Sequence, residues 1–361
     1  MTRTTRVAVI GGDGVGPDVV AVAQRALEAA GGAAGVTYAF EALPYGADHY
    51  LATGETLPEA AFERLRSDFD AILLGALGDP RVPRNQHARD ILLGLRFRLD
   101  LYINLRPARL LHPSLCPLKA RPDGAPRAID LVVFRENTEG AYVGIGGTFK
   151  SGTPEEIAIS EDLNTYRGVK RIIRAAFDFA VEQQRPRVTL CDKANALPHA
   201  HGLWRRVFAE VAAEFPFVKT EAEYVDALAM KLVLHPEHYS VIVTPNLFGD
   251  ILSDLIAALV GGLGLAASAN LHPGRVGLYE PVHGSAPDLA GTGTANPMAA
   301  VLAAALLAEH TGAPKVARAL EAAVTDALAA GVMTPDIGGA GSTAEVGDWI
   351  CRRLAGAPGG T

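Results

Sequence analysis

The chain has 361 residues, of which 49% are hydrophobic and 20% charged, a balance that is ordinary for a globular protein and excludes a disordered one. Its formal net charge of −7 argues against a nucleic-acid partner, because phosphate binding needs a basic surface. The length exceeds the size at which a single hydrophobic core usually stops growing, so we expect two domains.

The cysteines and the apolar runs indicate the cellular setting. Cys116, Cys191 and Cys351 are widely spaced and odd in number, so we predict neither a disulfide framework nor a Cys-based zinc site. Such cysteines suit a reducing cytoplasm. The apolar run before Gly11 is too short for a signal peptide, and the glycine-interrupted stretch Leu255–Ala269 is too short to span a bilayer. We therefore expect a cytoplasmic protein that does not contact a membrane.

A strand, a glycine turn and a helix open the predicted order of elements. Arg6–Ile10 reads as a strand, and a helix follows from Pro17 to about Ala30. The turn between them resembles the G-x-G-x-x-G fingerprint, but the position of its third glycine, counted from Gly12, is Pro17. We predict a tight turn with proline in the first helical turn, and not a Rossmann fold.

Strands and helices alternate along the rest of the chain. Helical spacing of apolar residues appears in Ile91–Leu101, and helices dominate from Met298 onward. Strand, loop and helix in repetition predict an α/β protein with ligand loops at strand ends. The proline-rich segment Leu111–Ala128 is expected to be a surface connection near a domain boundary. The further predicted strands are Ala71–Leu74, Ile129–Phe134, Arg187–Leu190 and Val241–Thr244.

Three aspartates are candidate metal ligands. Asp250 and Asp254 are four residues apart at the start of a predicted helix, so their carboxylates point the same way. Complementing the helix dipole is the alternative role of such a pair. Asp226 opens another predicted helix, where an N-cap is the alternative. Three oxygen ligands without a Cys or His pattern favour Mg²⁺ or Mn²⁺ over zinc.

Cationic and phenolic side chains suggest a substrate with carboxylates. Arg96, Arg106 and Arg135 offer guanidinium groups that match carboxylates in a bidentate fork. Arg96 or Arg106 alone reads as a surface arginine, whereas Arg135 directly follows an apolar predicted strand and is harder to explain in that way. Lys193 directly follows a predicted strand, and Tyr142 lies in a polar loop, where it is either a core-edge tyrosine or a proton donor. The small residues of His283–Asp288 would let backbone N–H groups approach a dinucleotide, or form only an irregular turn.

Together these segments resemble the β-decarboxylating dehydrogenase family, which contains 3-isopropylmalate, isocitrate, homoisocitrate and tartrate/malate dehydrogenases. The resemblance covers nearly the whole chain. It implies an α/β, isopropylmalate dehydrogenase-like two-domain fold with a large mixed sheet, not a Rossmann fold. Its motifs, in the family's order, are Asn104-Leu-Arg-Pro107, Arg135-Glu-Asn-Thr-Glu-Gly140, Asp192-Lys-Ala-Asn195, Asn246-Leu-Phe-Gly-Asp-Ile-Leu-Ser-Asp254 and Glu280-Pro-Val-His-Gly-Ser-Ala-Pro-Asp288.

The resemblance also implies domains, an assembly and residue roles. Residues 1–101 and 261–361 would form a terminal domain with most of the NAD site, and residues 102–260 a central domain with the dimer interface and metal ligands. A homodimer would share its active sites, with Lys193 and Asp226 reaching the site of the neighbouring subunit. Lys193 and Tyr142 would be catalytic and Asp226, Asp250 and Asp254 would bind the metal. The substrate would contact Arg96, Arg106, Arg135, Leu92, Leu93 and Asn195, and NAD would contact His283, Gly284, Ser285, Ala286, Asp288 and Asn296.

Positions at which members of the family differ indicate the cofactor and the substrate. Relatives that use NADP typically have lysine and then tyrosine where this chain has Asp288 and a leucine, and a carboxylate there would repel a 2′-phosphate, so we expect NAD. Leu92 and Leu93 suit an isopropyl group, which favours 3-isopropylmalate among the small 2-hydroxy dicarboxylates. Homoisocitrate, tartrate or D-malate and isocitrate remain alternatives. A third carboxylate would need further cations, which Arg81, Arg84 and Arg89 could supply.

Overall fold

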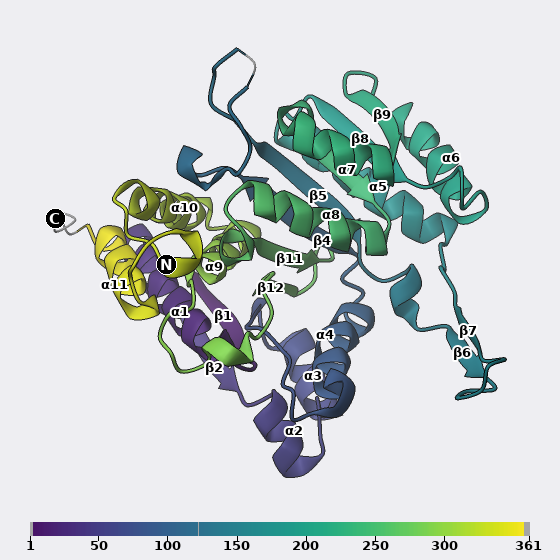
Figure 1. Cartoon of the computed structure of the whole chain (residues 1–361). Helices are drawn as coiled ribbons and strands as arrows, with labels where there is room; N and C mark the ends of the chain where they lie inside the picture. The colour runs from purple at the N-terminus through teal and green to yellow at the C-terminus, as the bar shows by residue number, and fades with distance from the viewer. Residues whose placement is uncertain (1–2, 122, 357–361) are drawn as a thin grey trace. The chain divides into compact units, whose positions relative to one another are not determined.

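The structure is a computed structural model that describes residues 3–121 and 123–356 (Figure 1). The chain divides into two compact units. The terminal unit contains the residues up to Leu101, the segment Leu110–Arg127 and the residues from Ala257 on, and the central unit contains Tyr102–Arg109 and Ala128–Ile256.

The two units differ from the predicted domain ranges at Leu110–Arg127, which groups with the terminal unit and not with the centre of the chain. The packing of Leu115 gives the physical reason. Its Cβ lies 3.2 Å from the point that a Cβ on Gly261 would occupy, so the segment packs against the turn that begins the second half of the terminal unit. The roles expected of each domain stay predictions.

Five strands of the terminal unit pair in the order β2, β1, β3, β12, β11 within the described residues. β1 is parallel to β2 and β3, β3 is parallel to β12, and only the β11–β12 pair is antiparallel, so the arrangement is mixed. All four residues of β3 are buried, as expected of a strand covered on both faces. The strands are β1 (Arg3–Ile10), β2 (Val36–Leu43), β3 (Ala71–Leu74), β11 (Ala267–Leu271) and β12 (Gly277–Pro281).

The helices of the terminal unit form two groups (Figure 1). α1, α9, α10 and α11 pack on one another, and α9 is almost entirely apolar and buried, so its sequence has no exposed face. α3 and α4 enclose a core of side chains that includes Phe62, Leu65, Leu95 and Leu278. The helices are α1 (Gly16–Ala34), α2 (Ala47–Thr53), α3 (Glu59–Ser67), α4 (Gln86–Arg98), α9 (Met298–His310), α10 (Pro314–Ala329) and α11 (Thr343–Leu354).

In the central unit five strands pair in the order β4, β5, β10, β8, β9. β5, β10, β8 and β9 are parallel, and β4 is antiparallel to β5. α5 packs on β5, β10 and β8, and α7 packs on β8 and β9. The strands are β4 (Ile103–Arg109), β5 (Asp130–Glu136), β8 (Arg187–Asp192), β9 (Lys219–Tyr224) and β10 (Val241–Thr244), and the helices are α5 (Tyr166–Glu182), α6 (Ala200–Ala212), α7 (Val225–Leu234) and α8 (Asn246–Leu259).

A separate antiparallel hairpin projects from the central unit (Figure 1). It consists of β6 (Gly146–Phe149) and β7 (Ile157–Ser160), and all eight of its strand residues are exposed. The sequence analysis did not predict this hairpin. An isolated two-stranded hairpin has only marginal stability in water. The exposed apolar side chains of this hairpin therefore indicate that it packs against another protein surface.

The predicted strands and helices are present, with shifts at their ends. β3 and β10 match their predicted ranges, whereas α4 ends at Arg98 and not at Leu101, because Asp100 has a left-handed φ of 54° that a helix cannot continue through. Cys116, Cys191 and Cys351 are all free. Within residues 3–121 and 123–356, no helix is long and apolar enough to cross a membrane.

Candidate active site

The candidate site of the central unit begins at the carboxyl edge of its parallel strands. Thr244, the last residue of β10, is in register with Arg135 near the end of β5. Lys193 follows β8 directly, and α8 begins two residues after β10 ends. Because the carboxyl ends of parallel strands meet at one edge, the fold gathers side chains that are far apart in the sequence.

Asp250, on the second turn of α8, accepts hydrogen bonds from side chains that follow or end the strands at this edge. Its carboxylate receives Nη1–H of Arg135 on one oxygen and the hydroxyl of Tyr142, at 2.6 Å, on the other. Arg135 is 1% exposed, and its Nε donates to Asn246 at 3.0 Å. A Cβ on Gly249 would lie 2.5 Å from Cγ of Arg135, so only glycine lets α8 approach the buried guanidinium this closely.

Arg106 approaches the same helix from the neighbouring strand β4. Its Nη2 lies 3.3 Å from Asp250, and its Nη1 donates to the hydroxyl of Ser253 at 2.6 Å and lies 3.6 Å from Asp254. Its Nε donates to Asn104 at 2.7 Å. Burial raises the pKa of Asp254, while Arg106 acts in the opposite direction. Two arginines and two aspartates thus form one cluster in which each charge faces an opposite charge.

The donor set of α8 fits part of a site for a hard divalent cation. Asp250 and Asp254 are one helical turn apart, and their side chains remain 37% and 54% exposed. Asp226 is on α7, where it accepts from Nζ of Lys193 at 2.5 Å, and this hydrogen bond lowers the pKa of the Asp226 carboxyl. In the part of the chain that the structure describes, no three His, Cys, Asp or Glu side chains are grouped to hold a metal. Asp250 and Asp254 are together on α8, and Asp226 is on α7, so the three-aspartate site stays a prediction.

Tyr142 donates a hydrogen bond to Asp250 and keeps its own proton. It lies in a 3₁₀ turn (Ala141–Val143), and its ring is below the guanidinium of Arg135, 5.1 Å from the ring centre. Burial, and then the hydrogen bond to Asp250, raise the pKa of the Tyr142 hydroxyl above its usual value near 10. The phenol therefore keeps its proton throughout the neutral range.

Three of the predicted substrate contacts on α4 are buried or partly buried. Arg96 on α4 is 5% exposed and donates through Nη2 to Glu280 on β12 at 2.9 Å, while its buried Nε has no partner among the described residues. Leu92 and Leu93 are half-buried one turn earlier, and Leu92 packs against the core of the terminal unit. Asn195, two residues after Lys193, is exposed.

The segment His283–Asp288 packs against the glycine turn before α1. The amide of Val15 donates to the carbonyl of Ser285 at 2.9 Å, and a Cβ on Gly14 would lie 2.0 Å from that oxygen. Gly284 and Asp288 are exposed, and Ala286 adopts a left-handed φ of 39°. Gly14 therefore permits close packing of this loop, and Gly12 permits close packing against the carbonyl of Ala76, which explains both glycines without a Rossmann phosphate site.

His283 has a buried atom that fits a dinucleotide. Its Nδ1 is 2.9 Å from the carbonyl of Gly284, so the proton of the neutral ring is on Nδ1. Burial lowers the pKa of His283, which favours that neutral form. The other nitrogen, Nε2, is buried without a partner among the described residues, and as an acceptor it suits an N–H or O–H group of adenosine.

Asn296 is engaged by its own unit. Its Oδ1 accepts the amide of Met298 at the start of α9, and its Nδ2 donates to Asp336 at 3.1 Å. The predicted cofactor contact of Asn296 therefore has the second amide proton and the second lone pair of Oδ1 available to it. The hydrogen bond from the amide of Met298 shows that Asn296 caps the N-terminus of α9.

Comparisons with known proteins connect this geometry to a family. The family described as isocitrate/isopropylmalate dehydrogenase matches residues 6–350. The 3-isopropylmalate dehydrogenase of Beutenbergia cavernae is 48% identical over 359 residues, which is 99% of this chain and 100% of that protein. The enzyme of that name from Thermobifida fusca is 46% identical over 98% of each chain. The crystal structure of isocitrate dehydrogenase from Methylococcus capsulatus superposes with a TM-score of 0.88 at 37% identity, covering 97% of this chain and 99% of that one.

The chain belongs to the isocitrate/isopropylmalate dehydrogenase family. Membership confirms the predicted family, the α/β fold with mixed strand pairing and the enzyme class, a decarboxylating dehydrogenase. Dehydrogenases of this family depend on NAD and a divalent metal and act on small hydroxy acids. The assignment of individual residues in this chain to these roles stays a prediction.

Several residues that hold the site were missed by the sequence analysis as separate candidates. Asn104, Asn246 and Ser253 accept from the two site arginines, and Glu280 accepts from Arg96. All four lie inside the motifs that carry the family resemblance. Membership of a motif was the available signal that these residues matter to the family. It does not identify their partners, because in three of the four cases the partner is more than 100 positions away in the sequence.

Proposed function

We propose that this protein catalyses the NAD-dependent oxidative decarboxylation of 3-isopropylmalate to 4-methyl-2-oxopentanoate, a step of leucine biosynthesis. Relatives of that name cover nearly the whole chain at 46–48% identity, which supports this substrate. The observation that carries the proposal is the cluster in which Arg106 and Arg135 meet Asp250 and Asp254 beside Tyr142. Such a set offers guanidinium groups to carboxylates, oxygen ligands to a cation and a proton donor at one place.

Each side chain of the mechanism has one task. Arg96, Arg106 and Arg135 bind the two carboxylates of the substrate and fix its orientation. Leu92 and Leu93 contact the isopropyl group. The orphaned Nε2 of His283 and the exposed carboxylate of Asp288 accept hydrogen bonds from NAD, and the charge of Asp288 disfavours a 2′-phosphate.

The proton steps belong to Lys193 and Tyr142. Asp226, Asp250 and Asp254 would hold a divalent metal that would polarise the substrate's hydroxyl and carboxylate oxygens, and bound NAD would supply the hydride acceptor. Lys193 takes the hydroxyl proton as the hydride leaves C2, which oxidises the alcohol to a ketone. The C3 carboxylate then leaves as carbon dioxide, and Tyr142 delivers a proton to C3 in exchange.

The contacts of Arg81 argue against a substrate with a third carboxylate. Its guanidinium donates to Asp79 at 2.6 Å and to Asp48 at 2.7 Å, and the hydrogen bonds from Arg81 lower the pKa of Asp79 to about 2. An arginine held between two carboxylates has little charge to offer a ligand. Of the three arginines that could bind a third carboxylate, Arg81 is therefore already engaged, which favours 3-isopropylmalate over homoisocitrate and isocitrate, while Arg84 and Arg89 are exposed.

A homodimer with shared active sites is part of the proposal. α7 and α8 expose large apolar side chains, including Met230 at 57% and Ile251 at 58%, and the β6–β7 hairpin exposes Phe149 at 64%. Large apolar side chains exposed on these elements suit a protein interface. A second copy would also supply Asp226 as the third metal ligand, because the described residues of one chain group no three side chains that could hold a metal.

The test is a comparison of substrates by NADH formation. With Mg²⁺ or Mn²⁺ present, we expect 3-isopropylmalate to have the highest kcat/KM among 3-isopropylmalate, homoisocitrate, isocitrate, D-malate and tartrate, with NAD preferred over NADP. Chelation should abolish turnover and added Mg²⁺ should restore it. A higher kcat/KM with homoisocitrate or D-malate would contradict the assignment of 3-isopropylmalate as substrate. Turnover that survives chelation would contradict the proposed metal site.

A further inference from the structure

The backbone of Lys193 is held by a buried histidine. Lys193 follows β8, and its amide N–H donates to Nδ1 of His201, on the first turn of α6, at 2.8 Å. His201 is 1% exposed, so this hydrogen bond is shielded from water. The loop between the two residues closes on itself, since the amide of His201 donates to the carbonyl of Leu197, whose own amide donates to the carbonyl of Lys193.

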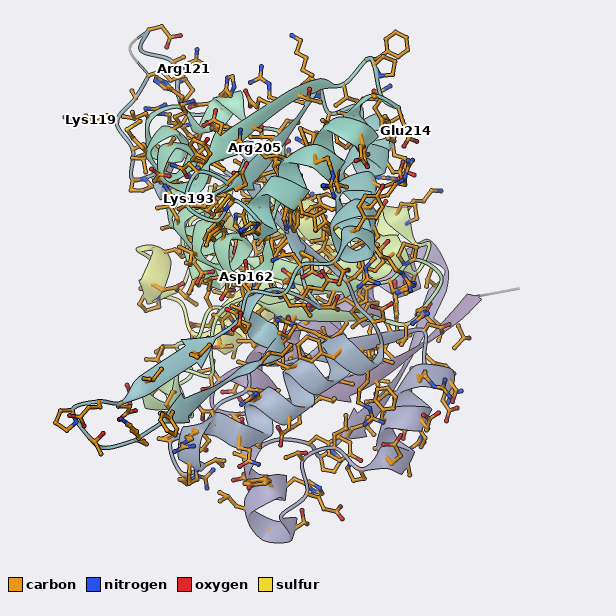
Figure 2. All side chains as sticks on the ribbon, turned by 90° about the vertical axis from the view of Figure 1, so that its right-hand side faces the viewer. Lys119, Arg121, Asp162, Lys193, Arg205 and Glu214 are labelled. Atoms are coloured by element: carbon orange, nitrogen blue, oxygen red, sulfur yellow. The ribbon has the colours of Figure 1, made fainter. Side chains whose placement is uncertain are left out.

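The other nitrogen of the ring faces a carboxylate. Nε2 of His201 is 3.4 Å from Oδ2 of Asp162, and this interaction lowers the pKa of Asp162. Since Nδ1 accepts from Lys193, the proton of the neutral ring must be on Nε2, where Asp162 favours it. The carboxylate therefore selects the tautomer that leaves an acceptor for the lysine backbone. Figure 2 labels Asp162, Lys193 and Arg205 in the same part of the central unit.

A second anchor holds the residue after Lys193. Asp192 is fully buried, and its two oxygens accept the amide of Ala194 and Nε of Arg205, both at 2.7 Å. Arg205 is one turn beyond His201 on α6. Two side chains of one helix thus fix the backbone on either side of the lysine, while Nζ is left to reach Asp226.

We infer that His201 is a positioning residue for Lys193: with its tautomer set by Asp162, it fixes the backbone from which the lysine reaches the reacting hydroxyl. This inference rests on the proposed role of Lys193 as proton acceptor. His201 does not need to touch the substrate. Its loss misplaces Nζ, and a misplacement of about 1 Å can cost up to about 100-fold in rate.

Two substitutions at His201 separate positioning from packing. His201→Leu retains much of the volume and removes the acceptor, whereas His201→Asn places an amide oxygen near the position of Nδ1. We expect kcat to fall about 10- to 100-fold in His201→Leu with KM for the substrate nearly unchanged, because arginines bind the carboxylates. His201→Asn should recover most of kcat. His199→Leu, at an exposed histidine two residues earlier, is the matched control and should behave as wild type.

Readouts without turnover keep this inference distinct from the proposed function. In the wild-type protein at pH 8, ¹⁵N NMR should show His201 protonated on Nε2 and not on Nδ1, and the amide of Lys193 should exchange faster in His201→Leu than in His201→Asn. The opposite tautomer, or equal loss of kcat in both variants with equal loss of Tm, would overturn the positioning role. Full turnover in Lys193→Met would overturn the proposed function instead, since the tautomer and the exchange rates do not depend on it.

Discussion

A substitution at Tyr142 tests its proposed role as the proton donor of the clustered side chains. Its hydroxyl donates to Asp250, and its raised pKa keeps the proton in place below pH 10. We expect Tyr142→Phe to lower kcat by about 10²- to 10⁴-fold, the usual contribution of general acid catalysis, with a smaller change in KM. Steady-state NADH formation measures both constants.

The matched control for that substitution is Tyr166→Phe. Tyr166 is in the same unit, is 44% exposed and donates to Glu210 at 2.8 Å on the surface. It should leave kcat unchanged. If Tyr142→Phe also turned over normally, the phenol would be a structural partner of Asp250 and the proton would come from another group.

At this scale the sequence predicted which side chains would lie together better than it predicted their other partners. Arg106, Arg135, Tyr142 and Asp250 were candidates, and the structure brings them together. The acceptors that hold the arginines were not predicted, because a serine or asparagine in a motif does not indicate its partner. Ser253 is 147 positions from Arg106, and only the completed sheet and α8 bring the two together.

The N-terminus of α11 shows how a local signal stabilises a whole element. Ser342 accepts the amide of Glu345, and Glu345 accepts the amide and hydroxyl of Ser342, which is a complete capping box. We expect Ser342→Ala to cost about 1 kcal/mol and to lower Tm by about 2 °C, measured by calorimetry at pH 7. Ser151→Ala, in an exposed turn, is the control and should leave Tm unchanged.

The same cap has a defined pH dependence. The hydrogen bonds from Ser342 lower the folded-state pKa of Glu345. Its contribution is therefore present above the unfolded pKa of about 4.3 and is lost as the pH falls through the lower folded value. The Tm difference between wild type and Glu345→Gln should shrink over that acid range. A difference that stays constant down to pH 2 would contradict a charged cap.

Elements with local patterns could be predicted from the sequence, and elements defined by pairing could not. β3 and β10 are continuous apolar runs and match their predicted ranges. β4 contains two arginines and Pro107, so it lacks the alternation of a strand, yet it pairs along its whole length with β5. The left-handed φ of Asp100 ended α4 before the apolar pattern did, because helical spacing alone does not reveal a backbone turn.

At the scale of the whole molecule, the pairing of Lys193 with Asp226 is the feature behind the proposed exchange between two chains. The pair is on β8 and α7, whereas Asp250 and Asp254 are on α8, and the described residues contain no group of three that could hold a metal. If two chains exchange these contributions, each active site combines the α8 carboxylates of one subunit with Lys193 of the other.

Mixing two inactive variants tests that exchange. Lys193→Met and Asp250→Asn homodimers should each be inactive, since every site contains a substitution. Refolding or co-expressing them in equal amounts makes about half of the dimers hybrids with one intact site each, so activity should return to about a quarter of wild type. Lys193→Met mixed with Asp254→Asn should recover to the same extent, whereas Asp250→Asn with Asp254→Asn should stay inactive. If active sites lay within single chains, no mixture would recover, because every chain would still carry a defective site.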